Sequence, residues 1–146
     1  MEPSKVIRSP AELEGTAYFE FLPGPYRGDH WVNGSVFIQE QVFCLIESAL
    51  QRHHPGFDHY SSATIPESEW VLIIRELEEL ARRARASVSL ADLREAGVGF
   101  HRHGVDAEFE QDLRQNSEAL AELAAELAGW LRGTLADHEV VSVLGM

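Results

Sequence analysis

Five carboxylates in the last third of the chain are spaced so that they could form one charged surface. If residues 105–131 form a single helix, a step of about 100° per residue places these side chains within a sector of about 120°. They are Glu108, Asp112, Glu118, Glu122 and Glu126. Like charges four residues apart disfavour an isolated helix. This carboxylate ridge therefore predicts a surface that binds a basic patch on a partner protein; the alternative is a solvated helix face that keeps an acidic protein soluble.

The seven histidines of the chain are a second set of residues that could bind a metal or act in catalysis. Two groups could meet in space and bind a metal, and their members are His53, His54, His59, His101 and His103. The spacing matches neither an HExxH motif nor a pair of helical histidines four residues apart, and no cysteine cluster accompanies it. We therefore predict no metal and no cofactor, and retain a His-based metal-dependent enzyme or metal-binding domain as the alternative hypothesis.

The remaining nucleophiles do not form a catalytic motif. Cys44 lies between Phe43 and Leu45 in an apolar helical stretch, which predicts a buried and inert thiol. The serines at 61 and 62 are not part of a GxSxG elbow, and the glycines at 97, 99 and 104 match neither phosphate-binding pattern. The sequence therefore assigns no catalytic residue, and it favours a binding protein over an enzyme.

The segment PGPYRGDHW, residues 23–31, is too rich in proline and glycine for regular structure and too aromatic for a bare linker. Loops that combine aromatic and charged residues are common in binding sites. We predict that Tyr26, Asp29 and Trp31 contact a partner. The alternative is that Tyr26 and Trp31 seal one end of the core.

Composition limits the class of protein and of partner. The net charge of −12 makes nucleic acid and an anionic membrane unfavourable partners and favours a basic one. A single cysteine fits a reducing compartment, and no apolar run reaches the roughly 18 residues of a membrane span. The start of the chain lacks the apolar core of a signal peptide. We expect one cytoplasmic domain spanning residues 1–146, with residues 1–12 as a flexible lead-in.

Hydrophobic periodicity predicts the elements that must position these residues. The apolar stretch from Val32 to Leu50 indicates a buried central helix, and we expect three main helices, over about 35–53, 66–85 and 105–131. A short helix over 89–96 should end at Gly97. Segments 16–22, 57–63 and 138–144 have the composition of strands. The predicted fold is α+β, with the helices packed on a small antiparallel or mixed sheet.

Several stretches carry a resemblance to a class of bacterial proteins. They are FEFLPGP, GDHWVNGSVF, FDHY and IPESEW, within residues 18 to 75. With its size and acidity, the chain resembles the cytoplasmic immunity proteins that protect bacteria from polymorphic or secreted toxins. The resemblance implies a non-enzymatic protein that covers a toxin's active site, and it identifies no contact residues.

Three hypotheses about function result. The first is an immunity- or antitoxin-type protein that binds a basic surface through the carboxylate ridge and the aromatic loop. The second is the His-based metal-dependent domain. The third is a homodimer whose seam is the apolar stripe of the last helix, which includes Leu127 and Trp130. The sequence leaves a monomer and a homodimer both open.

Overall fold

A four-stranded antiparallel sheet forms one layer of the structure, a computed structural model that describes residues 5–146. The strand order is β2-β1-β4-β3. The strands are β1 (Tyr18–Pro23), β2 (Val36–Gln39), β3 (Ser62–Pro66) and β4 (Val140–Leu144). The helices are α1 (Glu40–His53), α2 (Glu67–Ala86), α3 (Leu90–Glu95), α4 (Val105–Gln111) and α5 (Leu113–Leu135), with a short 3-10 turn over Pro10–Glu12. The predicted α+β class is confirmed.

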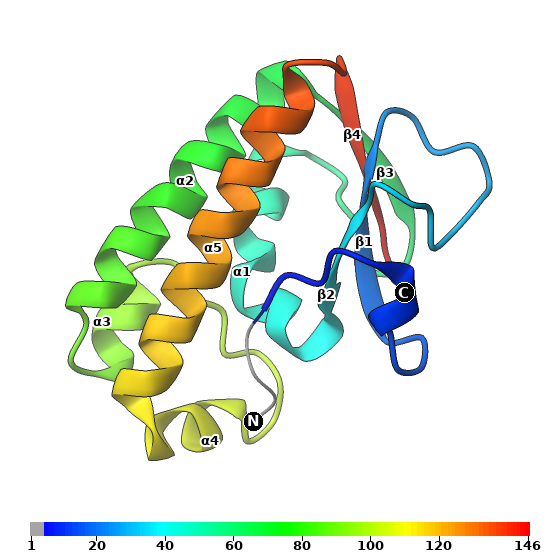
Figure 1. The fold of residues 1–146 in the computed structure, drawn as a ribbon. Helices are drawn as coiled ribbons and strands as arrows, with labels where there is room; N and C mark the ends of the chain where they lie inside the picture. Colours follow the sequence, from blue (N-terminus) through cyan, green and yellow to red (C-terminus); the bar gives the residue numbers. More distant parts are fainter. Residues whose placement is uncertain (1–4) are drawn as a thin grey trace.

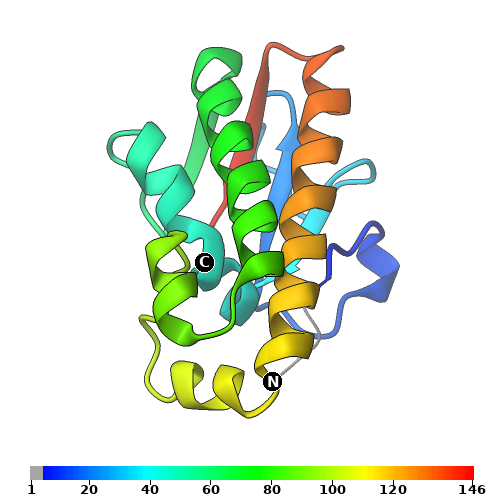
Figure 2. The same ribbon diagram turned by 90° about the vertical axis from the view of Figure 1, so that its left-hand side faces the viewer.

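All of the α-helices lie on one side of the sheet (Figures 1 and 2). The pleat of β1 explains this arrangement, because successive side chains point to opposite faces of a strand. Phe19 and Phe21 enter the main core with the helices, whereas Tyr18 belongs to a second, smaller apolar cluster with Ile7 and Phe37. The segment between β1 and β2 projects on the far side of the sheet from the helices (Figure 1). The sheet therefore separates a helical layer from a loop layer.

The beginning of the predicted central helix is wrong. Residues 36–39 form β2, which pairs with β1, and α1 begins only at Glu40. Val36, Phe37 and Ile38 are all buried, so this run has no alternation that would distinguish a strand from a buried helix. Its β-branched and aromatic residues favour a strand once β1 is available as a partner. The buried helix itself is confirmed over 40–53.

The predicted helix over 105–131 is two helices. α4 ends at Gln111 and α5 begins at Leu113, and between them Asp112 has φ −131° and ψ 53°, which is not helical. The apolar stripe of α5 faces the chain's own core: Leu120, Leu123 and Leu127 are buried there, and Trp130 packs against the same cluster. Leu127 is thus not exposed in the way that the homodimer seam requires.

Of the other predicted element boundaries, some are confirmed and some are wrong. The helix predicted over 66–85 is α2, the short helix is α3 with Gly97 behind it at φ 99°, and the strands near 16–22 and 138–144 are β1 and β4. The strand predicted over 57–63 is wrong for residues 57–61, which are irregular, and β3 begins only at Ser62. Of the predicted flexible lead-in, residues 1–4 lie outside the described residues. Val6 and Ile7 are buried, and Ile7 bridges to Phe37.

None of the helices within residues 5–146 combines the length and the apolar composition that crossing a bilayer requires.

Candidate functional site

The loop over residues 24–35 is held by one buried carboxylate. Glu20 lies on the loop side of β1 and is only 1% exposed. Its two oxygens accept hydrogen bonds from the backbone N–H groups of Trp31 at 2.7 Å and Val32 at 3.0 Å. Trp31 has φ 58°, and among the described residues it is the only non-glycine with a positive φ. A strained backbone of this kind persists only where its surroundings fix it, and here Glu20 does so.

The predicted partner-binding residues Tyr26, Asp29 and Trp31 all lie on this loop. The Tyr26 hydroxyl and His30 Nε2 are hydrogen-bonded at 3.0 Å, so two polar tips are paired across the loop. The Trp31 ring packs against Tyr18 and Phe37 and remains 36% exposed. A cavity of about 180 Å³ beside them is lined by Leu22, Pro23, Pro25, Arg27, Asp29 and Val32. The loop thus both seals the second apolar cluster and presents an aromatic surface.

The carboxylate ridge is not the continuous surface that the helical wheel predicts. Because the helix breaks at Asp112, the positions of Glu108 and Asp112 on α4 and its end no longer follow from those on α5. Glu118 accepts a hydrogen bond from Arg114 at 3.2 Å and lies 3.9 Å from Arg85. Glu126 pairs with Arg8 at 2.9 Å. Exposed ion pairs of this kind are screened and weak, but they reduce the local negative charge available to a partner.

The two halves of the predicted binding site do not form one surface. The 24–35 loop lies on one side of the sheet, and α4 and α5 lie on the other (Figure 1). Glu122 is exposed on α5 and forms no ion pair with any of the described residues. A single partner surface could reach the loop or the helix pair, and only an extended partner could reach both.

The five histidines of the metal hypothesis are dispersed. His54 Nδ1 lies 2.5 Å from Glu69, and His53 Nε2 lies 3.6 Å from Glu76, so both face α2. His101 and His103 are exposed on the segment before α4. His59 alone enters a cluster of potential ligands, and its neighbours there are carboxylates and a thiol.

This polar cluster consists of Glu40, Cys44 and Glu47 on one face of α1, together with His59 and Arg102. His59 Nδ1 lies 2.7 Å from Glu47 Oε2, and its Nε2 lies 2.8 Å from Glu40 Oε2. Arg102 donates to the other oxygen of Glu40 at 3.0 Å. The backbone carbonyl of His59 accepts from the Met146 N–H at 3.0 Å. The imidazole is therefore fixed from both ring nitrogens and through its own backbone.

The pKa values in the cluster follow from these contacts. Burial acts to lower the pKa of His59, but the hydrogen bonds and charges of Glu40 and Glu47 outweigh it, so the pKa is raised. The hydrogen bond from His59 holds the pKa of Glu40 below its usual value against the effect of burial, and Arg102 acts in the same direction. Burial and the charges of Glu47 and Glu40 raise the pKa of the Cys44 thiol. These shifts favour the protonated imidazole of His59, the ionised carboxylate of Glu40 and the neutral thiol of Cys44.

This protonation pattern is unsuited to thiol nucleophilic catalysis. Such catalysis needs a thiolate or a base that is free to form one. Cys44 is next to carboxylates that disfavour its anion, and both nitrogens of His59 are already engaged. The predicted burial of Cys44 is confirmed. The sequence analysis missed the cluster because α1 was judged by its apolar residues; the signal was the spacing of Glu40, Cys44 and Glu47 at i, i+4 and i+7, which places them on one helix face.

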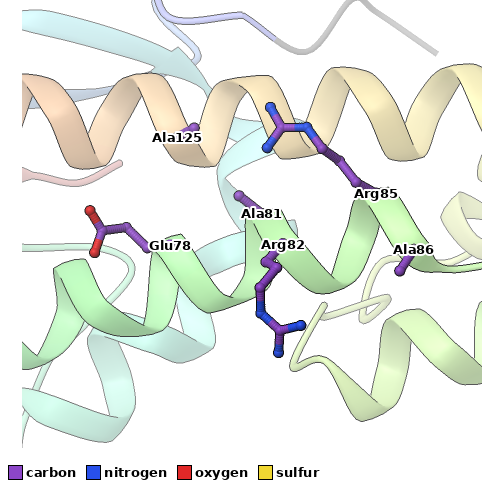
Figure 3. A pocket seen from close by; sticks show the side chains of 6 residues that line it. All are labelled: Glu78, Ala81, Arg82, Arg85, Ala86 and Ala125. Carbon is purple, nitrogen blue, oxygen red and sulfur yellow. The ribbon is translucent and has the colours of Figure 1, made fainter.

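A groove between α2 and α5 has a volume of about 500 Å³. It is lined by Glu78, Ala81, Arg82, Arg85, Ala86 and Ala125 (Figure 3). Glu78 pairs with Arg132, and Arg82 pairs with Glu79. Ala81 on α2 faces Ala125 on α5, and the charged side chains around them already have partners. The groove therefore offers no convergent set of ligand-binding groups.

Comparison with known proteins adds no relative. No protein-family model, no curated protein and no solved structure matches the chain.

Proposed function

We propose that this chain is a cytoplasmic, non-enzymatic protein-binding domain of the immunity or antitoxin kind, which recognises a basic surface on a partner protein through the 24–35 loop. The observation that carries the proposal is the fixation of Trp31 at φ 58° by the buried Glu20 carboxylate. Burying a carboxylate is costly unless it is well hydrogen-bonded. A loop built in this way is ordered before binding, which reduces the entropy lost on association.

The composition of the loop supports a protein as the partner. Tyr and Trp are enriched at the centres of protein interfaces, where a large and rigid ring contributes area at a small entropic cost. Trp31 offers such a ring at the surface, and Asp29 adds an exposed carboxylate beside it. The net charge of −12 would attract a basic partner and accelerate its association.

The test is capture of a partner from lysate of the source organism on immobilised protein, with matched variants. Trp31→Ala removes the exposed ring, and Val88→Ala removes an apolar side chain that is 80% exposed. Val88 lies between α2 and α3, and that junction is across the molecule from the loop (Figure 1). The expected result is a basic protein that is retained by the wild type and by Val88→Ala, lost with Trp31→Ala, and eluted by high salt.

Two results would contradict the proposal. Equal retention by Trp31→Ala and the wild type would show that the loop is not the contact surface. Equal loss with Val88→Ala and Trp31→Ala would show that retention depends on general surface hydrophobicity. Glu122→Gln, on the helical side, tests the carboxylate ridge as the contact surface in the same experiment, because its loss of binding would place the partner on α5 instead of on the loop.

A further inference from the structure

We propose that Cys44, Glu47 and His59 form a binding site for one Zn²⁺ ion. The three residues supply a sulfur, a carboxylate oxygen and an imidazole nitrogen within 4.8 Å of one another. Thiolate, imidazole and carboxylate are the three ligand types that zinc uses in proteins, and zinc accepts three protein ligands with a water in the fourth position. The site is independent of the 24–35 loop and of the function proposed for it.

The geometry needs little adjustment to admit the ion. With Zn–S near 2.3 Å and Zn–N and Zn–O near 2.0–2.2 Å, the ligand atoms of a tetrahedral site lie roughly 3.4–3.6 Å apart. His59 Nδ1 and Glu47 Oε2, now 2.7 Å apart, would separate by less than 1 Å. The sulfur of Cys44 would approach them by about 1 Å from the outer limit of the cluster. Side-chain torsions on α1 allow movements of this size without displacing the helix.

The surroundings of His59 match the outer shell of a metal-bound histidine. A histidine that binds a metal through one nitrogen commonly donates its other N–H to a carboxylate, which fixes the tautomer and the ring orientation. His59 Nε2 has this partner in Glu40 at 2.8 Å, and Arg102 holds the second oxygen of that carboxylate at 3.0 Å. The Met146 N–H fixes the His59 carbonyl. Nδ1 is thereby directed toward Glu47 and the helix face that carries Cys44.

Charge balance also permits Zn²⁺ to replace the protons of Cys44 and His59. Without metal, both ring nitrogens of His59 face carboxylate oxygens, so a doubly protonated imidazole can donate to Glu47 and to Glu40, and its charge with that of Arg102 would balance the two carboxylates. When Zn²⁺ binds, the thiol of Cys44 loses its proton to solvent and forms the Zn–S bond, and His59 Nδ1 loses its proton and forms the Zn–N bond. Two positive charges enter and two protons leave, so the cluster keeps its net charge. His59, with a side chain 17% exposed, leaves a path from solvent.

The experiment is a titration of the purified, tag-free protein with Co²⁺ and then with Zn²⁺ in competition with a chromophoric chelator. A tetrahedral Co²⁺ site with one thiolate gives strong visible d–d bands and a sulfur-to-cobalt charge-transfer band in the near ultraviolet. We expect both bands to saturate at one equivalent and to disappear on addition of Zn²⁺. Two protons released per metal ion should make the affinity fall as pH is lowered.

Variants assign the ligands. Cys44→Ser should abolish the charge-transfer band, and Glu47→Gln should weaken binding. Glu40→Gln should preserve the band and weaken binding by roughly 10- to 100-fold, as loss of a second carboxylate partner does. His54→Ala is the matched control, because His54 also pairs with a carboxylate next to α1 but lies outside the cluster.

The wild-type spectrum decides the outcome even where a variant fails to fold. A folded wild-type protein with no thiolate-to-cobalt band and no stoichiometric zinc would overturn the proposal and leave the cluster as an ion-pair network that fixes the turn after α1. Metal binding that survives Cys44→Ser and is lost with His54→Ala would also overturn it, because the ion would then be bound by other histidines.

Discussion

Replacing Glu20 with alanine should release the 24–35 loop while the sheet stays folded. The substitution removes both acceptors of the Trp31 and Val32 N–H groups. Hydrogen bonds to a charged acceptor contribute about 1.5–3 kcal/mol each. The strain of the Trp31 backbone belongs to the closed loop in both proteins, so it cancels from the difference between them. The free energy of loop opening should therefore fall by about 3–6 kcal/mol, equivalent to roughly a 100- to 20,000-fold larger open population.

Limited trypsin digestion measures this opening directly, because Arg27 is exposed within the loop. Where loop opening is fast relative to cleavage, the rate of cleavage after Arg27 follows the open population. We expect that rate to rise by the factor given above in Glu20→Ala, and by less in Glu20→Gln, which keeps one acceptor oxygen. Cleavage after Arg75, within α2, is the internal reference.

A core variant separates local release from general unfolding. Val143→Ala removes fully buried apolar volume from β4 and should accelerate cleavage after Arg27 and Arg75 by similar factors. If Glu20→Ala behaved in the same way, Glu20 would support the whole fold and not the loop in particular. An unchanged rate after Arg27 would mean that the loop does not depend on Glu20. Either result would refute the reasoning.

Three further predictions concern the core and the polar cluster. In metal-free protein, the raised pKa of His59 contributes stability that is fully present below the usual histidine pKa of about 6.5, and the lowered pKa of Glu40 contributes stability that is present above about 4.3. The free energy of unfolding, measured by urea denaturation across pH, should therefore be largest between roughly pH 4.5 and 6.5. Its decline on the alkaline side should flatten in His59→Gln. Trp70→Phe removes a buried hydrogen bond of 3.1 Å to the Val141 carbonyl together with ring volume, and it should lower the free energy of unfolding by about 2–4 kcal/mol in the same assay. An effect under 1 kcal/mol would show that the core repacks around the loss. Gly145→Ala would place a Cβ against the His59 carbonyl and 2.7 Å from the Ser61 carbonyl, so the Tm of this variant should fall. Gly133→Ala, whose Cβ would meet no other segment within 4 Å, should instead gain about 0.5–1 kcal/mol from helix propensity. A Tm of Gly145→Ala equal to that of the wild type would contradict this packing.

The fold class could be predicted because the spacing of apolar residues identifies long amphipathic helices. α2 buries Trp70, Ile73, Ile74 and Leu77 at helical spacing, and its predicted boundaries are within a residue or two of the observed ones. β2 could not be separated from α1 by the same means, since Val36, Phe37 and Ile38 continue directly into the apolar helix. Only the pairing with β1, a contact distant in the chain, decides the conformation of that run.

The candidate sites depend on contacts between segments that are distant in the chain, and a helical wheel of one segment cannot predict these contacts. The wheel placed Glu118 and Glu126 on an open ridge, but their partners Arg85 and Arg8 come from other segments. Likewise, His59 was noted as one histidine among several, and its carboxylate neighbours become visible only when the turn after α1 folds back onto that helix. The sequence singled out the aromatic loop but not its buried anchor Glu20, because a glutamate in an alternating strand is typical of a solvent-facing position.

Site-specific photocrosslinking in the source cells tests the proposed recognition loop most directly. A photoreactive amino acid at position 27 replaces the exposed Arg27, and its removal of a positive charge does not disfavour a basic partner. The same amino acid at position 88 is the control. We predict a covalent adduct with a basic protein from position 27 and none from position 88. No adduct from position 27, or the same adduct from both positions, would contradict it.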